Sequence, residues 1–130
     1  MAVVDEFLTK DVISHCWNLG QKLKDGINQL GQEIGVNVSW NGTPVRGAIS
    51  FNEKSISPTL LHSIFLQECI CQGIMFGPGE TLISYSHSLT DVEKTLNVVS
   101  KSLEKIKTGI QNNNVSKLLE GKEFKAVMTF

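Results

Sequence analysis

The residues through which this chain could do chemistry are few: three histidines, three cysteines, a single arginine and one glycine-rich turn. His15, His62 and His87 stand far apart in the sequence and form neither an H-x-x-x-H nor an H-E-x-x-H pattern. Such spacings bring two imidazoles to one face of a helix, where they can share a metal ion. We therefore expect no metal site, and we place His15 and His62 on the flanks of helices.

The cysteines Cys16, Cys69 and Cys71 are odd in number and show no C-x-x-C spacing. Cys69 and Cys71 are two positions apart on an expected helix, where such side chains point in different directions. Neither a chelate nor a redox pair follows from that arrangement. We expect all three to be reduced thiols that take part in core packing.

Arg46, the only arginine, and Glu80, in the turn GIMFGPGE, are the two candidates for contact with a substrate. An arginine on a strand can hold a carboxylate through two parallel N–H···O bonds, and a carboxylate beside a turn can anchor a polar ligand. Both residue types are also common as solvated surface side chains, and the sequence leaves that alternative open. The turn lacks the G-x-x-x-x-G-K-[ST] pattern of a phosphate-binding loop. From the histidines, the cysteines, Arg46, Glu80 and this turn we predict no complete active site. We assign no catalytic residue and no cofactor-binding residue to the chain.

His87 stands where an expected strand meets the last helix, a position that often carries function. The commoner role for such a histidine is a hydrogen bond at the start of the helix. Two capping boxes compete to begin that helix: Ser88 with Asp91, or Thr90 with Glu93. The residues alone do not decide between them.

Charge and composition exclude several classes of protein. A formal net charge of −1 gives no large basic surface for nucleic acid or an anionic membrane. No apolar run approaches the roughly 18 residues that a transmembrane helix needs. Asp5 and Glu6 stand where a secretory signal would carry positive charge. We therefore expect a cytoplasmic protein with neither a nucleic-acid nor a membrane partner.

Hydrophobic periodicity predicts one domain over residues 1–130. Residues 3–34 carry apolar side chains at three- and four-residue steps, which indicates one long helix. Gly20 and Gly26 would weaken this helix unless another segment packs close to their backbone. Alternating apolar residues on both sides of Asn41-Gly42 predict a β-hairpin over residues 36–51.

The second half of the chain predicts two more helices and a third strand. Ser57 and Pro58 begin a helix that ends near Gly73, and residues 82–87 form a strand. Residues 89–110 carry a regular apolar seam that suits packing against a sheet. The order α-β-β-α-β-α predicts an α+β fold, in which helices cover one face of a small antiparallel or mixed sheet.

The segment GIMFGPGETLISYSHSLTDVEKTL, residues 73–96, resembles the closing segment of class III (fold type I) pyridoxal-phosphate (PLP) aminotransferases. Within that group it looks most like the glutamate-1-semialdehyde aminomutase branch. That branch has a Gly-Val/Ile pair, a turn with proline, and then S-x-x-H-T-x-x-D-I-x-x-T-L. The chain matches this pattern from Ser84 to Leu96, with Ser88 in place of the usual threonine.

The two ends of the chain extend the resemblance. Residues 17–42 are similar to the helix and first strand of the same small domain. Residues 118–130 are similar to a terminal L-x-G-x-P-x-x-P-V-F-R pattern. Glu123 and Ala126 stand where this pattern has prolines, and Thr129 stands where it has arginine.

The resemblance covers nearly the whole chain but only the C-terminal small domain of such an enzyme. It implies that the large domain, with its Schiff-base lysine and PLP site, is absent and that this chain alone is inactive. The full-length parent would bind PLP and form a homodimer, and its small domain would close one side of the active site and help to select the substrate.

The resemblance also suggests roles for single residues. Glu80 stands one residue out of register with an acidic residue that lies near the substrate in the aminomutase branch. Arg46 lies in the strand region where some class III enzymes have an arginine. His87, Ser88 and Asp91 fall at the strand-to-helix junction, where the resemblance implies a structural role.

Two other functions remain open from the sequence. The chain could be a stand-alone α+β module that binds a small ligand near Arg46, Glu80 and His87. It could also be a regulatory or assembly module that dimerises through the seam of its last helix.

Overall fold

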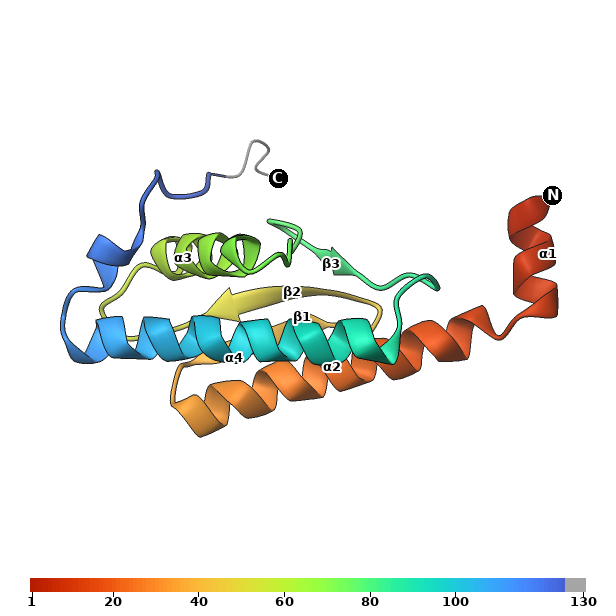
Figure 1. Cartoon of the computed structure of the whole chain (residues 1–130), viewed down its shortest axis with the longest axis horizontal. Coiled ribbons are helices and arrows are strands. Elements are labelled where there is room, and N and C mark those ends of the chain that lie inside the picture. The colour runs from red at the N-terminus through yellow and green to blue at the C-terminus, as the bar shows by residue number, and fades with distance from the viewer. Residues whose placement is uncertain (126–130) are drawn as a thin grey trace.

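A computed structural model describes residues 1–125 of the chain, and Figure 1 shows the arrangement of its elements. In chain order these are α1 (Ala2–Thr9), α2 (Val12–Ile34), β1 (Val38–Gly42), β2 (Arg46–Phe51), α3 (Pro58–Cys71), β3 (Thr81–Leu82), α4 (Leu89–Gln111) and the 3₁₀ helix η1 (Val115–Leu118). The predicted α+β class is confirmed.

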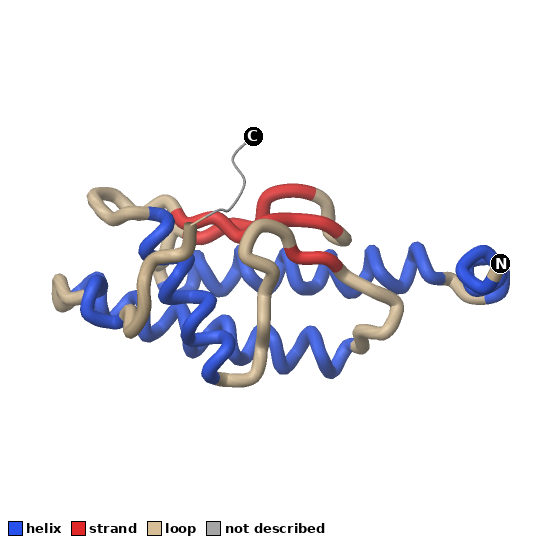
Figure 2. The backbone as a smooth tube through the Cα atoms, turned by 90° about the horizontal axis from the view of Figure 1, so that it is seen from above, coloured by secondary structure: helices blue, strands red, loops and turns tan. Residues whose placement is uncertain are grey.

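The three strands form one antiparallel sheet in the order β1-β2-β3. Figure 2 shows the strands gathered on one side of a layer made by the helices. Because side chains alternate along a strand, Val38, Trp40, Ile49 and Phe51 face this layer and are buried. Within residues 1–125 the opposite face of the sheet has no helix over it, as the sequence predicted.

The single helix expected over residues 3–34 is wrong, because the chain breaks at Lys10 and Asp11. Lys10 is extended, with φ −128° and ψ 147°. The Asp11 side chain accepts a hydrogen bond from the Ser14 backbone N–H and so caps a new helix, α2. The result is a short helix α1 that projects from the end of the domain (Figure 1).

Two glycines of α2 allow close packing, as predicted. A Cβ atom at Gly20 would lie 2.1 Å from the backbone oxygen of Pro44, in the hairpin turn. A Cβ atom at Gly26 would lie 2.6 Å from the end of the Leu96 side chain, on α4. These contacts bring the hairpin turn and α4 directly against the surface of α2.

The predicted β-hairpin is confirmed, although its turn follows Asn41-Gly42 and is not formed by these two residues. Both of those residues pair within the ladder, and residues 43–45 make the turn. The Trp40 indole N–H donates to the Thr43 carbonyl at 2.9 Å. The indole lies over Gly47, where a Cβ atom would be 2.1 Å from Nε1. The hairpin is therefore closed by a buried tryptophan that leaves room only for glycine opposite it.

The third strand is much shorter than residues 82–87. Only Thr81 and Leu82 pair with β2, and the Ile83 N–H adds a bond to the Val45 carbonyl at 3.1 Å. Beyond them the chain turns, because the His87 N–H donates to the Ser84 carbonyl at 3.1 Å. This local turn competes with strand pairing and directs the chain into α4.

The core lies between the helices and the sheet. The α4 seam is buried against α2 and α3 at Val92, Val99, Leu103 and Ile106, whereas Leu89 is exposed. Each fully buried aliphatic side chain stabilises the fold by roughly 1.5–3 kcal/mol. This seam is therefore internal to the domain.

The α3 helix begins at the Ser57 cap and Pro58, as predicted. Leu61, Ile64 and Phe65 form its buried stripe, but Ile70 is exposed. Cys69 is buried beside Ser102, and burial raises the pKa of its thiol to about 11. Cys71 is exposed, so the expectation of core packing for all three cysteines is wrong at this position.

The segment after α4 folds back along α3. The Gln67 side chain donates to the Leu118 carbonyl at 2.9 Å and accepts from the Glu120 N–H at 2.8 Å. The Phe124 N–H donates to Ser63 Oγ at 2.7 Å. Ala126 and Thr129, two positions of the terminal pattern discussed above, lie outside the described part of the chain.

Candidate functional site

Arg46 and Glu80, which the sequence offered as separate candidates, form one ion pair. Arg46 Nε donates to Glu80 Oε2 at 2.9 Å, and a terminal guanidinium nitrogen donates to Oε1 at 3.0 Å. The pair joins the first residue of β2 to the turn that precedes β3. Two parallel bonds of this kind fix both the distance and the plane of the two groups.

This pair lies on the uncovered face of the sheet, because Arg46 has the opposite side-chain direction to the buried residues Gly47 and Ile49. The same face carries Ser39, Ser50 and the exposed Asn41, whose amide donates to Ser50 Oγ at 2.7 Å. The hydrogen bonds to Glu80 and its negative charge raise the pKa of Arg46, so the guanidinium stays charged. The face is thus polar and solvent-accessible, with one oriented cation at its end.

His87 does not join this pair. Its Nδ1 accepts a hydrogen bond from the Ser84 N–H at 3.0 Å, and its backbone carbonyl accepts one from His15 Nε2 at 2.8 Å. The His15 ring also packs on Tyr85, with ring centroids 4.8 Å apart. The imidazole therefore holds the turn before α4, and the turn is attached to the start of α2.

Ser88 and Asp91 form the capping box at the start of α4. The Asp91 N–H donates to Ser88 Oγ at 3.2 Å, and the Ser88 N–H donates to the Asp91 carboxylate at 2.8 Å. The bonds from the Ser88 backbone and hydroxyl lower the pKa of Asp91. The competing box of Thr90 and Glu93 is not the one that forms. A small cavity of about 110 Å³ is lined by His87 and Asp91 and also by Thr81 and Leu82 of β3, whereas Arg46 and Glu80 are not among its lining residues.

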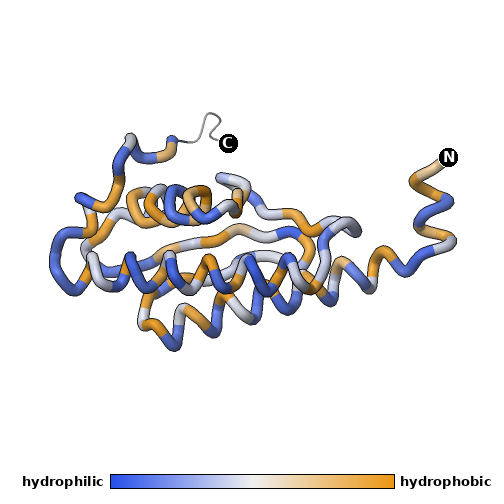
Figure 3. The backbone as a smooth tube through the Cα atoms, in the orientation of Figure 1, coloured by the Kyte–Doolittle hydropathy of each residue, from blue (hydrophilic) through white to orange (hydrophobic). Residues whose placement is uncertain are grey.

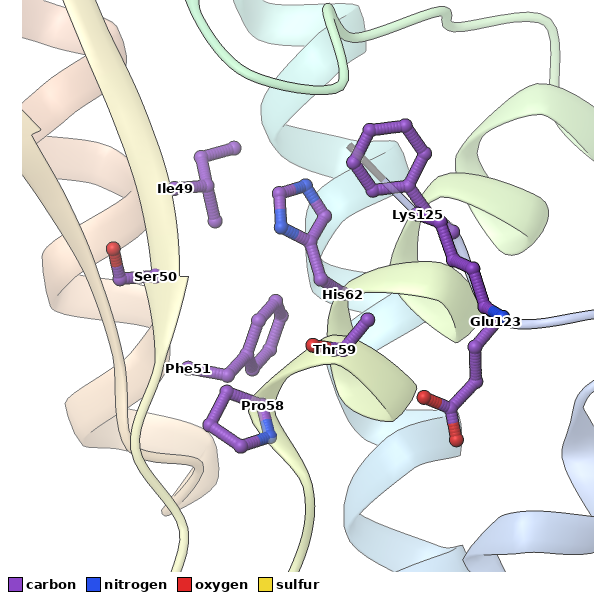
Figure 4. Close-up of a pocket in the computed structure, with 9 residues that line it drawn as sticks. Ile49, Ser50, Phe51, Pro58, Thr59, His62, Glu123 and Lys125 are labelled. Atoms are coloured by element: carbon purple, nitrogen blue, oxygen red, sulfur yellow. The ribbon is translucent and has the colours of Figure 1, made fainter. Parts of the chain in front are cut away.

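A larger hollow of about 650 Å³ lies between β2, the first turns of α3 and the segment that follows α4. Figure 4 shows His62 between Phe51 on one side and Glu123 and Lys125 on the other. Its ring lies 6.3 Å from the Phe51 ring and 6.5 Å from the Phe124 ring. Burial lowers the pKa of His62, so the neutral imidazole is favoured there.

Sequence reasoning missed both the ion pair and this hollow. Arg46 and Glu80 are 34 positions apart, and no pattern links their types. The hollow is lined by residues from 49 to 125, which meet only because the last segment folds back along α3. A sequence signal for the ion pair would need an alignment in which the two positions change together.

The described residues do not fit a PLP site. PLP requires a lysine that can form a Schiff base and a partner for its pyridinium nitrogen. The lysines are all exposed or half-buried, and several are engaged: Lys24 binds the Gly42 carbonyl, Lys107 the Gly35 carbonyl and Lys105 the Glu68 carboxylate. No step of PLP chemistry can be assigned to them.

Two further properties follow from the described part of the chain. Residues 1–125 contain no cluster of three or more histidine, cysteine, aspartate or glutamate side chains arranged to hold a metal ion. Among the helices of the same residues, none combines the length and apolar character needed to cross a membrane.

The comparisons by sequence find nothing: no family model matches the chain, and no curated protein matches it. Solved structures do match. The PLP internal aldimine form of the FumI protein from Sphingopyxis sp. MTA144 has a TM-score of 0.73, with 16% identity over 82% of this chain and 26% of its own.

Two transaminase structures match in the same way. An omega-transaminase from Sphaerobacter thermophilus has a TM-score of 0.63, with 18% identity over 70% of this chain and 23% of its own. A transaminase with PLP bound has a TM-score of 0.67, with 17% identity over 73% of this chain and 23% of its own. The chain thus spans about a quarter of the length of these structures, and it has the fold of one part of a PLP-dependent transaminase subunit.

Proposed function

We propose that this chain is the small domain of a PLP-dependent aminotransferase or aminomutase of class III, and that it acts by closing one side of the active site. The observation that carries the proposal is its fold, which matches about a quarter of several transaminase chains. The sequence of residues 73–96 supports the finer assignment to the glutamate-1-semialdehyde aminomutase branch.

In this proposal the cofactor belongs to the rest of the enzyme. When bound there, PLP supplies the electron sink for moving an amino group between an amine and a carbonyl compound. The small domain supplies a polar surface. Arg46, oriented by Glu80, lies on the uncovered face of the sheet and can present its guanidinium to a substrate carboxylate. Glu80 can in turn accept hydrogen bonds from a substrate ammonium group. These two residues would then contribute to substrate selection.

The proposal predicts that the isolated chain neither holds PLP at one site nor transaminates. The test is to incubate the purified chain with PLP, reduce it with borohydride and map any modified lysine by mass spectrometry. We expect sparse labelling spread over several lysines and no amino transfer to a keto acid. A single stoichiometric adduct on an active chain would overturn the proposal, because it would place a complete cofactor site within these residues.

The hollow around His62 favours one alternative function, a stand-alone ligand-binding module. Its volume falls in the range of small-molecule sites, and it combines aromatic walls with a neutral histidine. Calorimetric titration of the chain with small carboxylic acids would test it. Saturable micromolar binding that His62→Phe removes would favour this alternative, and the absence of binding would favour the small-domain proposal.

A further inference from the structure

One edge of the sheet, the outer edge of β1, is covered by α2. The Trp40 backbone N–H points away from β2 and donates to the Asn28 side-chain oxygen at 2.9 Å. The Gly42 carbonyl, on the same side of β1, accepts a hydrogen bond from the Lys24 ammonium at 3.1 Å. Proteins commonly cover strand edges in this way, because an exposed edge can pair with a further strand. The β1 edge is therefore protected by α2.

The other edge of the sheet is covered over only part of its length. Hydrogen-bonding directions alternate along an antiparallel strand. The Val45 carbonyl accepts from the Ile83 N–H at 3.1 Å, so the odd-numbered residues of β2 direct their backbone groups toward β3. β3 has only two residues and ends before it reaches Ile49 and Phe51. Among the described residues no strand pairs with these two on that side, and they form what is here called the open edge of β2.

The hollow of about 650 Å³ lies against the open edge, since Ile49 and Phe51 are among its lining residues. Its other walls are the first turns of α3, which include His62, and residues 123–125 (Figure 4). Figure 3 shows hydrophobic positions on both β2 and α3, which border the hollow. An extended peptide suits such a space, because its backbone pairs with a strand edge while alternate side chains enter apolar pockets.

The chain itself leads a segment to this hollow. The Phe124 N–H donates to Ser63 Oγ at 2.7 Å, which holds the end of the described chain against α3. Residues 126–130 follow directly. A strand rises about 3.3 Å per residue, so five residues can extend over roughly 16 Å. This length exceeds the three residues from Ile49 to Phe51 that the open edge requires.

The sequence of residues 126–130, AVMTF, suits a strand with one apolar face. Valine, threonine and phenylalanine favour strands, and the segment has neither proline nor a charged side chain. Successive side chains of a strand point to opposite faces. The even-numbered positions carry alanine, methionine and phenylalanine, whereas the odd-numbered positions carry valine and threonine. The even-numbered face is therefore the more apolar one.

We propose that residues 126–130 add to the open edge of β2 as a fourth strand and fill the hollow. Met128 and Phe130 then pack toward the helices beside the buried side chains of Ile49 and Phe51, because neighbours across an antiparallel pair share a face. The hollow is thus a site for a segment of the chain itself. This inference does not depend on the proposed function. The rival occupants are the same segment of a second copy and a small ligand.

Amide hydrogen exchange followed by NMR tests the proposal on the chain of residues 1–130 and on a variant that stops at Lys125. Removing residues 126–130 should raise the exchange rates of the Ile49 and Phe51 amides at least tenfold. The Ala48 and Ser50 amides point toward β1 and are the controls within the same strand, so their rates should change less than threefold. Unchanged rates, or equal changes at all four amides, overturn the proposal, because pairing at the open edge protects only alternate residues.

Two matched variants test which face of the added strand is buried. Met128→Asp places a charge on the face that packs toward the helices, and it should accelerate exchange at Ile49 and Phe51 as strongly as the truncation does. Thr129→Asp changes the next residue, on the opposite face, and should leave both rates within threefold of the wild-type values. Equal effects of the two variants contradict a strand with one buried face.

The two rival occupants give different results. If the open edge is protected only at concentrations where light scattering shows a dimer, the added strand comes from a second copy, and pairing within one chain is refuted. Saturable binding of a small carboxylic acid to the chain of residues 1–130, lost in His62→Phe, shows that the hollow is free for a ligand and also overturns the proposal. The proposed function stands or falls separately from each of these results.

Discussion

Gly20 shows how a single hydrogen in place of a side chain decides the packing of two segments. The Pro44 carbonyl occupies the space that a Cβ atom would need, and this oxygen belongs to backbone that cannot move aside cheaply. At Gly26 the corresponding contact is the flexible end of Leu96. The two glycines therefore differ in what their replacement would displace.

Gly20→Ala is expected to destabilise the chain by at least about 2 kcal/mol, because the hairpin turn must separate from α2. Gly26→Ala is the matched control on the same helix. It should change stability by less than about 1 kcal/mol, since the helix propensity gained from alanine offsets the movement of Leu96. Urea denaturation of both variants measures the difference, and equal effects would contradict the packing seen at Pro44.

The lowered pKa of His62 predicts how the stability of the chain changes with pH. Burial holds its pKa in the folded chain below the ordinary value of 6.5. The unfolded chain therefore binds a proton at a higher pH than the folded chain does. Above about pH 6.5 the neutral His62 ring makes its full contribution to the free energy of unfolding. As the pH falls below that value this contribution decreases, until His62 is protonated in the folded chain as well.

The measurement is the free energy of unfolding of the wild-type chain and of His62→Phe between pH 5 and pH 8. The wild-type chain should lose stability relative to the variant as the pH falls below 6.5. Parallel curves for the two proteins would show that the imidazole is not shielded between Phe51 and Phe124.

At the scale of elements, the pair of Arg46 and Glu80 compensates for a very short strand. β3 contributes only two residues to the sheet, so few backbone bonds hold the glycine-rich turn against β2. The ion pair adds a connection on the uncovered face. Both side chains are more than half exposed, so salt should screen their attraction.

A double-mutant cycle tests this connection. Arg46→Gln and Glu80→Gln should each lower the melting temperature slightly, and the double variant should lower it no further than one single variant does. In 1 M NaCl the three variants should approach the wild-type protein. Additive losses at low salt would mean that the two side chains act independently.

The elements also show what the sequence could and could not predict. Helix caps and hairpins depend on neighbouring residues, so Ser57 and the alternating residues around Asn41 predicted the right elements. The break at Lys10 was missed because apolar periodicity runs through it, although the apolar residues before the break, Val3, Val4, Phe7 and Leu8, are exposed and take no part in the core. The short β3 was missed because the bonds within the Ser84–His87 turn replace a strand whose composition is favourable.

The candidate site was predicted as residues but not as an arrangement. Arg46 and Glu80 were found by type, whereas their contact depends on how the glycine-rich turn returns to β2. The hollow at His62 could not be predicted at all, since its far wall comes from the segment that Gln67 and Ser63 hold in place. Long-range contacts of this kind leave no trace in local periodicity.

For the molecule as a whole, the burial of the apolar seam of α4 shows whether this seam belongs to the core or to a surface for assembly with another chain. Val99 is fully buried between α2 and α3 and has no access to another chain. Val99→Asp should therefore abolish cooperative unfolding, because it places an unpaired charge in the core. Lys101→Asp, on the exposed side of the same helix, is the control and should remain folded.

Circular dichroism during heating, together with light scattering, measures both outcomes. A folded monomer of Val99→Asp derived from a wild-type dimer would contradict the internal position of the seam. It would then favour the assembly module that the sequence left open.

The packing of α2 on α4 also determines when the core can form during synthesis of the chain. These two helices are the main partners of each other's apolar faces, yet more than fifty residues separate the end of one from the start of the other. During synthesis α2 and the hairpin leave the ribosome long before α4 exists to cover them. At translation rates of about 5–20 residues per second, this interval lasts several seconds. The α2 surface of the growing chain therefore stays exposed until α4 is made, and molecules stalled before α4 present that surface to chaperones and proteases.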